Sequence, residues 1–194
     1  MAIPKIITKN LIPTRQMFDR AMDWFDDKLE KLSMAKLKWQ VGHSTHSAPL
    51  PGTMMFFSYP RAKHAKTLPY WDTFPIVLPF NVKGDRFWGL NLHYLPLSGR
   101  IMLLSELQPL VQDSRLSGQR RMQLSWNLLQ KYASHAAIQK TVHCYLLTGN
   151  HIGSSFMMID SDEWANAALL PRERFVSERG GEKRRKVDPR KEVW

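Results

Sequence analysis

Two apolar and aromatic runs separated by one tight turn are the feature that most constrains the fold of this chain. The first run covers residues 74–80, the second covers residues 87–94, and Lys83-Gly84-Asp85 lies between them. Apolar runs of four to eight residues bounded by turn formers are typical of β-strands. Gly84 can adopt the positive φ that a hairpin turn requires. The sequence therefore predicts a β-hairpin here, and with it a sheet.

Further short runs around this hairpin predict a small sheet rather than a sandwich. A Pro-Leu-Pro-Gly turn at 49–52 precedes an apolar run at 54–57, and a basic loop follows that run. Pro75 and Pro79 cannot donate a hydrogen bond to a neighbouring strand, so their strand is expected at an edge or interrupted by bulges. Three or four such strands suit a small, strongly bent barrel or a sheet packed on helices.

Helices are predicted on both sides of this strand-rich region. Apolar residues recur at spacings of three and four over 14–36, and charged residues occupy the opposite face, which we interpret as a solvated surface. Two more helices are predicted within 96–132, with a break at Ser117-Gly118. Residues 135–147 fit a helix or a strand, 156–159 fit a strand, and a short helix begins at Asp160 or Ser161 and ends before Pro171.

These elements predict an α+β protein in three parts. The first is an N-terminal arm and helix over residues 1–36. The second is an α+β core domain over 37–176, and the third is a flexible basic tail over 177–194, where glycine and charged residues replace apolar periodicity.

The single cysteine, Cys144, excludes an intramolecular disulfide and a cysteine-based zinc cluster. It lies in the apolar run 142–147, where a small buried side chain is expected. The first ten residues lack the apolar segment of a signal peptide, and no run of about 18 apolar residues occurs. We therefore expect a protein that is not exported and does not contact a membrane.

Positive charge is the strongest functional signal of the composition. The chain has 28 Lys and Arg against 17 Asp and Glu, a formal net charge of +11. Such an excess favours a polyanionic partner, an acidic protein being the alternative. The candidate DNA-binding residues lie in the tail, in the loop after the run 54–57 and at a helix start: Lys183, Arg184, Arg185, Lys186, Arg190, Lys191, Arg61, Lys63, Lys66, Arg120 and Arg121.

Candidate catalytic residues are few. Asp72, His93 and Arg86 could supply a base, an acid and a phosphate-binding cation for a nuclease, but a turn cap for Asp72 and a core position for His93 are the favoured interpretation. His43 and His46 could share a metal, yet they lie in a turn without a companion ligand. No nucleotide-binding, hydrolase or zinc-protease motif occurs. We expect no cofactor and no metal.

Two aromatic stretches, 68–80 and 87–96, could stack on unpaired bases, although we expect them mainly in the core. These stretches and a third, later one carry a resemblance to a known family. The residues are Lys66-Thr67-Leu68-Pro69-Tyr70-Trp71-Asp72-Thr73-Phe74-Pro75, Gly89-Leu90-Asn91-Leu92-His93-Tyr94-Leu95-Pro96, and Glu163-Trp164 with Leu169-Leu170-Pro171-Arg172-Glu173-Arg174-Phe175. In this order they resemble the DNA end protectors of large contractile-tailed bacteriophages.

That resemblance implies a virion protein that acts at the end of packaged double-stranded DNA, shields it from exonuclease and is similar in role to head-completion and neck components. It implies no catalytic residue. Its expected partners are DNA ends and the portal, neck or tail proteins, and its expected locations are the virion and, during assembly, the host cytoplasm. The predicted barrel also resembles the SH3-like fold of PemK-type RNase toxins and of phage tail and neck adaptors.

Two alternatives to a DNA-end-binding protein remain open. A structural baseplate or neck adaptor would use the positive charge to complement an acidic neighbour. A small nuclease would depend on Asp72 or His93. Binding by an end protector should be independent of sequence, with Lys and Arg contacting phosphates, because such a protein must accept whatever end packaging leaves.

Overall fold

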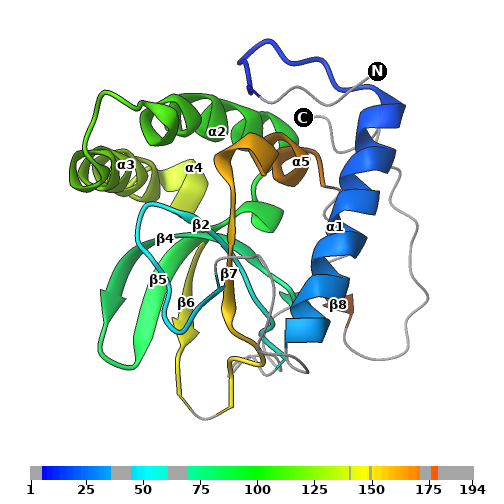
Figure 1. Cartoon of the computed structure of the whole chain (residues 1–194), viewed down its shortest axis with the longest axis vertical. Helices are drawn as coiled ribbons and strands as arrows, with labels where there is room; N and C mark the ends of the chain where they lie inside the picture. The colour runs from blue at the N-terminus through cyan, green and yellow to red at the C-terminus, as the bar shows by residue number, and fades with distance from the viewer. Residues whose placement is uncertain are drawn as a thin grey trace.

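The computed structural model describes residues 6–35, 45–60, 70–139, 141–148, 150–170 and 176–178, and it is α+β as predicted. Figure 1 shows α1 along one side of an antiparallel sheet and α2, α3 and α5 over one end of it. The strands are β1 (Thr45–His46), β2 (Met54–Phe56), β3 (Tyr70–Asp72), β4 (Ile76–Lys83), β5 (Arg86–Asn91), β6 (Val142–Leu146), β7 (Phe156–Ile159) and β8 (Val176–Glu178). The helices are α1 (Arg15–Ala35), α2 (Leu97–Gln112), α3 (Gly118–Ala133), α4 (Ala136–Gln139) and α5 (Trp164–Leu169), with 3₁₀ turns η1 (Leu92–Tyr94) and η2 (Ser161–Glu163).

Six strands form one open antiparallel sheet in the order β1-β7-β2-β4-β5-β6, and β3 pairs with β8 in a separate ribbon. The sequence prediction allowed a barrel or a sheet. The sheet is confirmed and the SH3-like barrel is wrong, because β1 and β6 are its two edges and do not pair with each other in the described part of the chain.

Both faces of the sheet are buried at β2, which explains why this strand is apolar at every position. Successive strand residues point to opposite faces. Met54 and Phe56 join the larger core with α1, α2 and α5, whereas Met55 and Phe57 join a second cluster with Phe87, Tyr145 and Phe156. The second cluster is mainly aromatic, with Phe57 and Phe156 ring centroids 4.8 Å apart. The aromatic stretches are thus largely core, as expected.

Helix α1 confirms the first predicted helix, and it begins directly after Thr14. Met17, Ala21, Phe25 and Leu32 on its apolar face are buried. The prediction that its other face is entirely solvated is wrong at Lys28, which is 4% exposed. The Lys28 ammonium pairs with the Glu163 carboxylate at 2.9 Å. This ion pair joins α1 to η2 and compensates for the burial of the Lys28 charge.

Helices α2 and α3 and the break before Gly118 are confirmed, and the Ser117 side chain caps α3. No helix in the described ranges is long and apolar enough to cross a membrane. The ambiguous stretch 135–147 forms α4 and β6. Cys144 in β6 is exposed, so its predicted burial is wrong. The reason is the alternation of the edge strand, which buries the neighbouring Tyr145.

The predicted hairpin is β4–β5, and Gly84 in its turn has φ of 59°. The strand with Pro79 is interior, and a register shift between Pro79 and Asn81 is the predicted bulge. Gly89 in β5 faces this bulged strand closely. A Cβ added there would lie 2.2 Å from Val77 Cγ1 and 3.1 Å from the Leu78 carbonyl oxygen. Only glycine allows the two strands to approach this far.

We therefore expect Gly89→Ala to lower the free energy of unfolding by about 1–3 kcal/mol, the usual cost of overpacking a core. Urea denaturation measures this change. Gly118→Ala is the matched control, because nothing lies within 4 Å of a Cβ added at Gly118. The control should be neutral or stabilise the fold by up to about 1 kcal/mol. Equal stabilities of the two variants would contradict the close approach.

Candidate functional site

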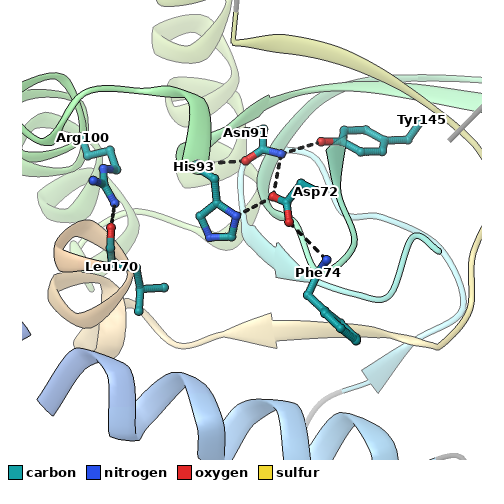
Figure 2. A network of polar contacts seen from close by, with 7 residues as sticks. All are labelled: Asp72, Phe74, Asn91, His93, Arg100, Tyr145 and Leu170. Carbon is teal, nitrogen blue, oxygen red and sulfur yellow. Dashed lines mark hydrogen bonds and ion pairs between the residues drawn. The ribbon is translucent and has the colours of Figure 1, made fainter. Parts of the chain in front are cut away.

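A buried carboxylate connects the β3–β8 ribbon to the main sheet (Figure 2). Asp72, the last residue of β3, is 5% exposed. Its Oδ2 lies 2.5 Å from His93 Nδ1 and accepts a hydrogen bond from Asn91 Nδ2 at 3.1 Å. Its Oδ1 accepts from the Phe74 backbone N–H at 3.2 Å. Both carboxylate oxygens are therefore satisfied, as a buried charge requires.

Asn91 is the residue that holds this network in place. It ends β5, and its Oδ1 accepts a hydrogen bond from the His93 backbone N–H at 2.9 Å, which caps η1. Asn91 is a preferred cap residue for this reason. Its Nδ2 also donates to the Tyr145 hydroxyl at 3.0 Å, so the amide joins β3, β5, η1 and β6.

Titratable neighbours of Asp72 are held in their neutral forms. Burial, followed by the charge of Asp72, raises the pKa of Tyr145 well above its ordinary value, and the same two causes raise the pKa of Tyr94. Burial lowers the pKa of His143, against an opposing effect of Asp72. Tyr145 and Tyr94 are therefore protonated, and His143 is uncharged, at neutral pH.

The network brings together two of the three candidate nuclease residues. Asp72 and His93 are in contact, but their side chains are 2% and 0% exposed, so DNA cannot reach them without opening the core. Arg86 is at the other end of β5, where it pairs with Asp85 at 2.9 Å. The expectations of a turn cap for Asp72 and a core position for His93 are both confirmed. The contacts of Asp72 with Asn91 and His93 hold β3 against the main sheet.

Hydrogen bonds beside this network close the base of a loop. The Tyr59 N–H donates to the Thr73 carbonyl at 2.7 Å, the Ser58 N–H donates to Ser154 Oγ at 2.9 Å, and the Gly153 N–H donates to the Ser58 carbonyl at 2.7 Å. We call Ser58, Tyr59 and Thr73 the loop stem. The chain between Pro60 and Tyr70 therefore leaves and re-enters the fold at one place. It contains the predicted DNA-binding residues Arg61, Lys63 and Lys66, which lie outside the described residues.

The β3–β8 ribbon brings the residue after the segment 61–69 next to the start of the predicted tail. Tyr70 is the register partner of Glu178, and Asp72 is the partner of Val176. The first two residues of the predicted tail, 177 and 178, thus lie in a strand rather than in a flexible segment. The predicted DNA-binding residues of the tail also lie outside the described residues: Lys183, Arg184, Arg185, Lys186, Arg190 and Lys191.

Arg120 and Arg121, the remaining predicted DNA-binding residues, are in the first turn of α3. Arg120 is exposed, and its Nη1 donates to Gln123 Oε1 at 2.9 Å. Arg121 is half-buried, and its Nη1 donates to the Val111 carbonyl at 3.1 Å, which ties α3 to the end of α2. Arg120 is the more accessible of the two.

Charge is distributed unevenly between the described part of the chain and the rest. The described residues include twelve Lys or Arg and thirteen Asp or Glu, whereas the whole chain has 28 and 17. The folded elements are therefore nearly neutral. The positive excess comes from the segments outside the described ranges, mainly 36–44, 61–69, 171–175 and 179–194.

Sequence reasoning missed two members of the buried network, Asn91 and Tyr145. Asn91 had a usable signal, because an asparagine between a strand and a following turn is a common cap. Tyr145 had none, since its partner is far away in the sequence. In the described ranges, no three His, Cys, Asp or Glu side chains are grouped so that they could hold a metal ion.

Removal of the Asp72 carboxylate should be costly. Asp72→Ala leaves the donors of His93, Asn91 and Phe74 without their acceptor, and we expect a loss of about 3–5 kcal/mol in the free energy of unfolding. Asp85→Ala is the control, because the Asp85–Arg86 pair is exposed and screened by solvent, so its loss should change the free energy of unfolding little. Urea denaturation of both variants tests this, and similar losses would refute the structural role of Asp72.

Comparison with known proteins supports the resemblance predicted from the sequence. The sequence model of a family described as "Phage T4 terminal DNA protecting protein" matches residues 8–189 of the 194. No curated protein and no solved structure matches the chain. The family match extends from before α1 to beyond β8 and includes the basic segment 61–69 and the tail cations Lys183, Arg184, Arg185 and Lys186. The chain therefore belongs to the family of the phage T4 terminal DNA protecting protein.

Proposed function

We propose that this phage protein binds the ends of packaged double-stranded DNA without cleaving them, through sequence-independent contacts between Lys and Arg side chains and phosphates. Binding shields the end from exonuclease or completes the junction between head and tail. Portal, neck or tail proteins are the further partners, and the protein acts in the virion after assembly in the host cytoplasm. The proposal extends the role in protecting terminal DNA by which the family is described.

The distribution of charge is the observation that carries this proposal. The described elements are nearly neutral, and most of the positive excess lies in segments that adjoin the loop stem and the β3–β8 ribbon in the sequence. Lys and Arg contacts to phosphates supply affinity through the release of counterions and carry no sequence information. Segments with many cations are therefore sufficient for a protein that must accept any DNA end.

Helix α1 supports the same assignment by contrast. It carries five acidic and four basic residues, so it has no positive excess to attract a phosphate backbone. The acidic residues are Asp19, Asp23, Asp26, Asp27 and Glu30. We therefore place the DNA on the basic segments with Lys183, Arg184, Arg185, Lys186, Arg190, Lys191, Arg61, Lys63 and Lys66, and on Arg120 and Arg121 of α3.

Binding should weaken steeply with salt. If about five phosphates are neutralised, the logarithm of the affinity should fall with the logarithm of salt concentration with a slope of roughly −4 to −5. Replacing Lys183, Arg184, Arg185 and Lys186 by alanine should flatten this slope by up to about 0.9 for each phosphate that the variant no longer neutralises. Fluorescence anisotropy of a labelled duplex at several salt concentrations measures both slopes.

A charge-matched control separates specific contacts from net charge. Replacing Arg15, Arg20, Lys31 and Lys83 by alanine removes the same four charges from described positions on α1 and β4. This variant should keep a slope close to that of the wild type. If the two variants behave alike, the tail cations do not bind the phosphates.

Protection of linear duplex DNA from an exonuclease tests the function itself. The purified protein is incubated with linear DNA, magnesium and an excess of closed circular duplex as competitor. Protection that survives the circle and is lost at higher salt is the expected result. Absence of both protection and cleavage would favour the structural adaptor, and cleavage by the protein would favour the nuclease.

A further inference from the structure

Helix α3 carries two large apolar side chains that the core does not use. Met122 is 48% exposed and Trp126 is 42% exposed, one helical turn apart. The Trp126 ring is not free to move, because its Nε1 donates to the Phe80 carbonyl of β4 at 2.6 Å. An aromatic ring fixed by a hydrogen bond and partly open to solvent forms a rigid platform for a flat partner.

The charges of α3 indicate which kind of partner fits this platform. The helix has three cations and no acidic residue. At 3.6 residues per turn its exposed face has three strips. The apolar edge is Met122 and Trp126, the middle strip is Gln123 and Asn127, and the opposite edge is Arg120 and Lys131.

Cationic and amide side chains are the groups that contact DNA phosphates, and Trp stacks on bases. Helix α1, with five acidic and four basic residues, lies at the opposite edge of the view in Figure 1. Of these two helices, α3 is therefore the one whose charge complements a polyanion.

Recognition of an end requires a contact that the interior of a duplex cannot make. Phosphates occur all along DNA, so phosphate contacts alone cannot distinguish an end from a closed circle. The end differs by exposing the outer face of its last base pair, which is stacked on a neighbour everywhere else. An exposed aromatic platform beside cations is suited to this face, because base–aromatic stacking tolerates any base.

We propose that α3 recognises the duplex terminus, with Trp126 and Met122 stacked on the last base pair and Arg120 and Lys131 on adjacent phosphates. This inference rests on the proposed DNA-end binding and assigns its selectivity for ends. The described residues that flank the basic segments are elsewhere in the fold, at the β3–β8 ribbon. The two regions thus have separate tasks: the basic segments provide affinity for any duplex, and α3 provides preference for its end.

The test compares binding to a blunt linear duplex with binding to a closed circle of the same sequence. Stacking of one base on an aromatic side chain corresponds to a preference of about 5- to 150-fold for the linear form. Met122→Glu places a negative charge on the platform, and Trp126→Leu removes the aromatic ring. Both variants should lose most of the preference while their affinity for the circle stays within about twofold of the wild type.

Met102→Glu is the matched control, because Met102 is a similarly exposed methionine, 43% accessible, on α2. It should keep the preference of the wild type. Urea denaturation identifies any variant that fails to fold. Met122→Glu keeps the test valid if Trp126→Leu unfolds, since the thioether of Met122 makes no hydrogen bond comparable to that of the Trp126 ring.

A fluorescent base analogue, 2-aminopurine, gives a direct signal. Placed in the last base pair, it should change fluorescence on binding of the wild type and much less with Met122→Glu, whereas the analogue in the centre of the duplex should respond equally to both. Unchanged end preference in folded variants would overturn the role of α3 and favour a protein partner for this face. A wild type that protects no ends would overturn the proposed function as well.

Discussion

The buried carboxylate of Asp72 is the interaction on which the attachment of the β3–β8 ribbon to the main sheet depends. A charge in the interior is tolerated only when several donors satisfy it. Asp72 obtains these donors from η1, from the end of β5 and from its own turn. One short strand is thereby attached to the main sheet, and β8 is attached to that strand. Without this attachment, the β3–β8 ribbon would have no hydrogen bonds from the Asp72 side chain to the main sheet.

Local patterns predicted most of the elements, and long-range pairing limited the rest. Helices α1, α2 and α3 and the β4–β5 hairpin follow from periodicity and turn residues near each other in the sequence. No local signal predicts that β7 inserts between β1 and β2, or that β3 pairs with β8, since each pairing joins distant segments. The predictions that Lys28 is solvated and that Cys144 is buried were wrong for the same reason. The exposure of each side chain depends on the element packed against it, which is distant in the sequence.

The sequence predicts which residues belong to the candidate site, but it does not predict how they are arranged in the fold. The basic clusters are evident in the sequence, and the family match agrees with the resemblance carried by three short motifs. Asp72 and His93 could be identified as a pair of interest, yet only the structure shows that they are inaccessible and bound to Asn91. The exposure of Met122 and Trp126 could not be predicted from the sequence either, because methionine and tryptophan in an amphipathic helix usually face the core.

The closed loop stem has a consequence for the thermodynamics of binding. Bringing the two ends of a flexible loop together costs entropy that grows slowly with its length. At Tyr59 and Thr73 this cost is met when the protein folds, before any DNA is present. Cations carried between such fixed ends lose less freedom on reaching a phosphate than cations on an unconstrained chain of equal length. Under the proposed function, the stem therefore acts as preorganisation, and the hydrogen bond between Tyr59 and Thr73 contributes to the affinity for DNA.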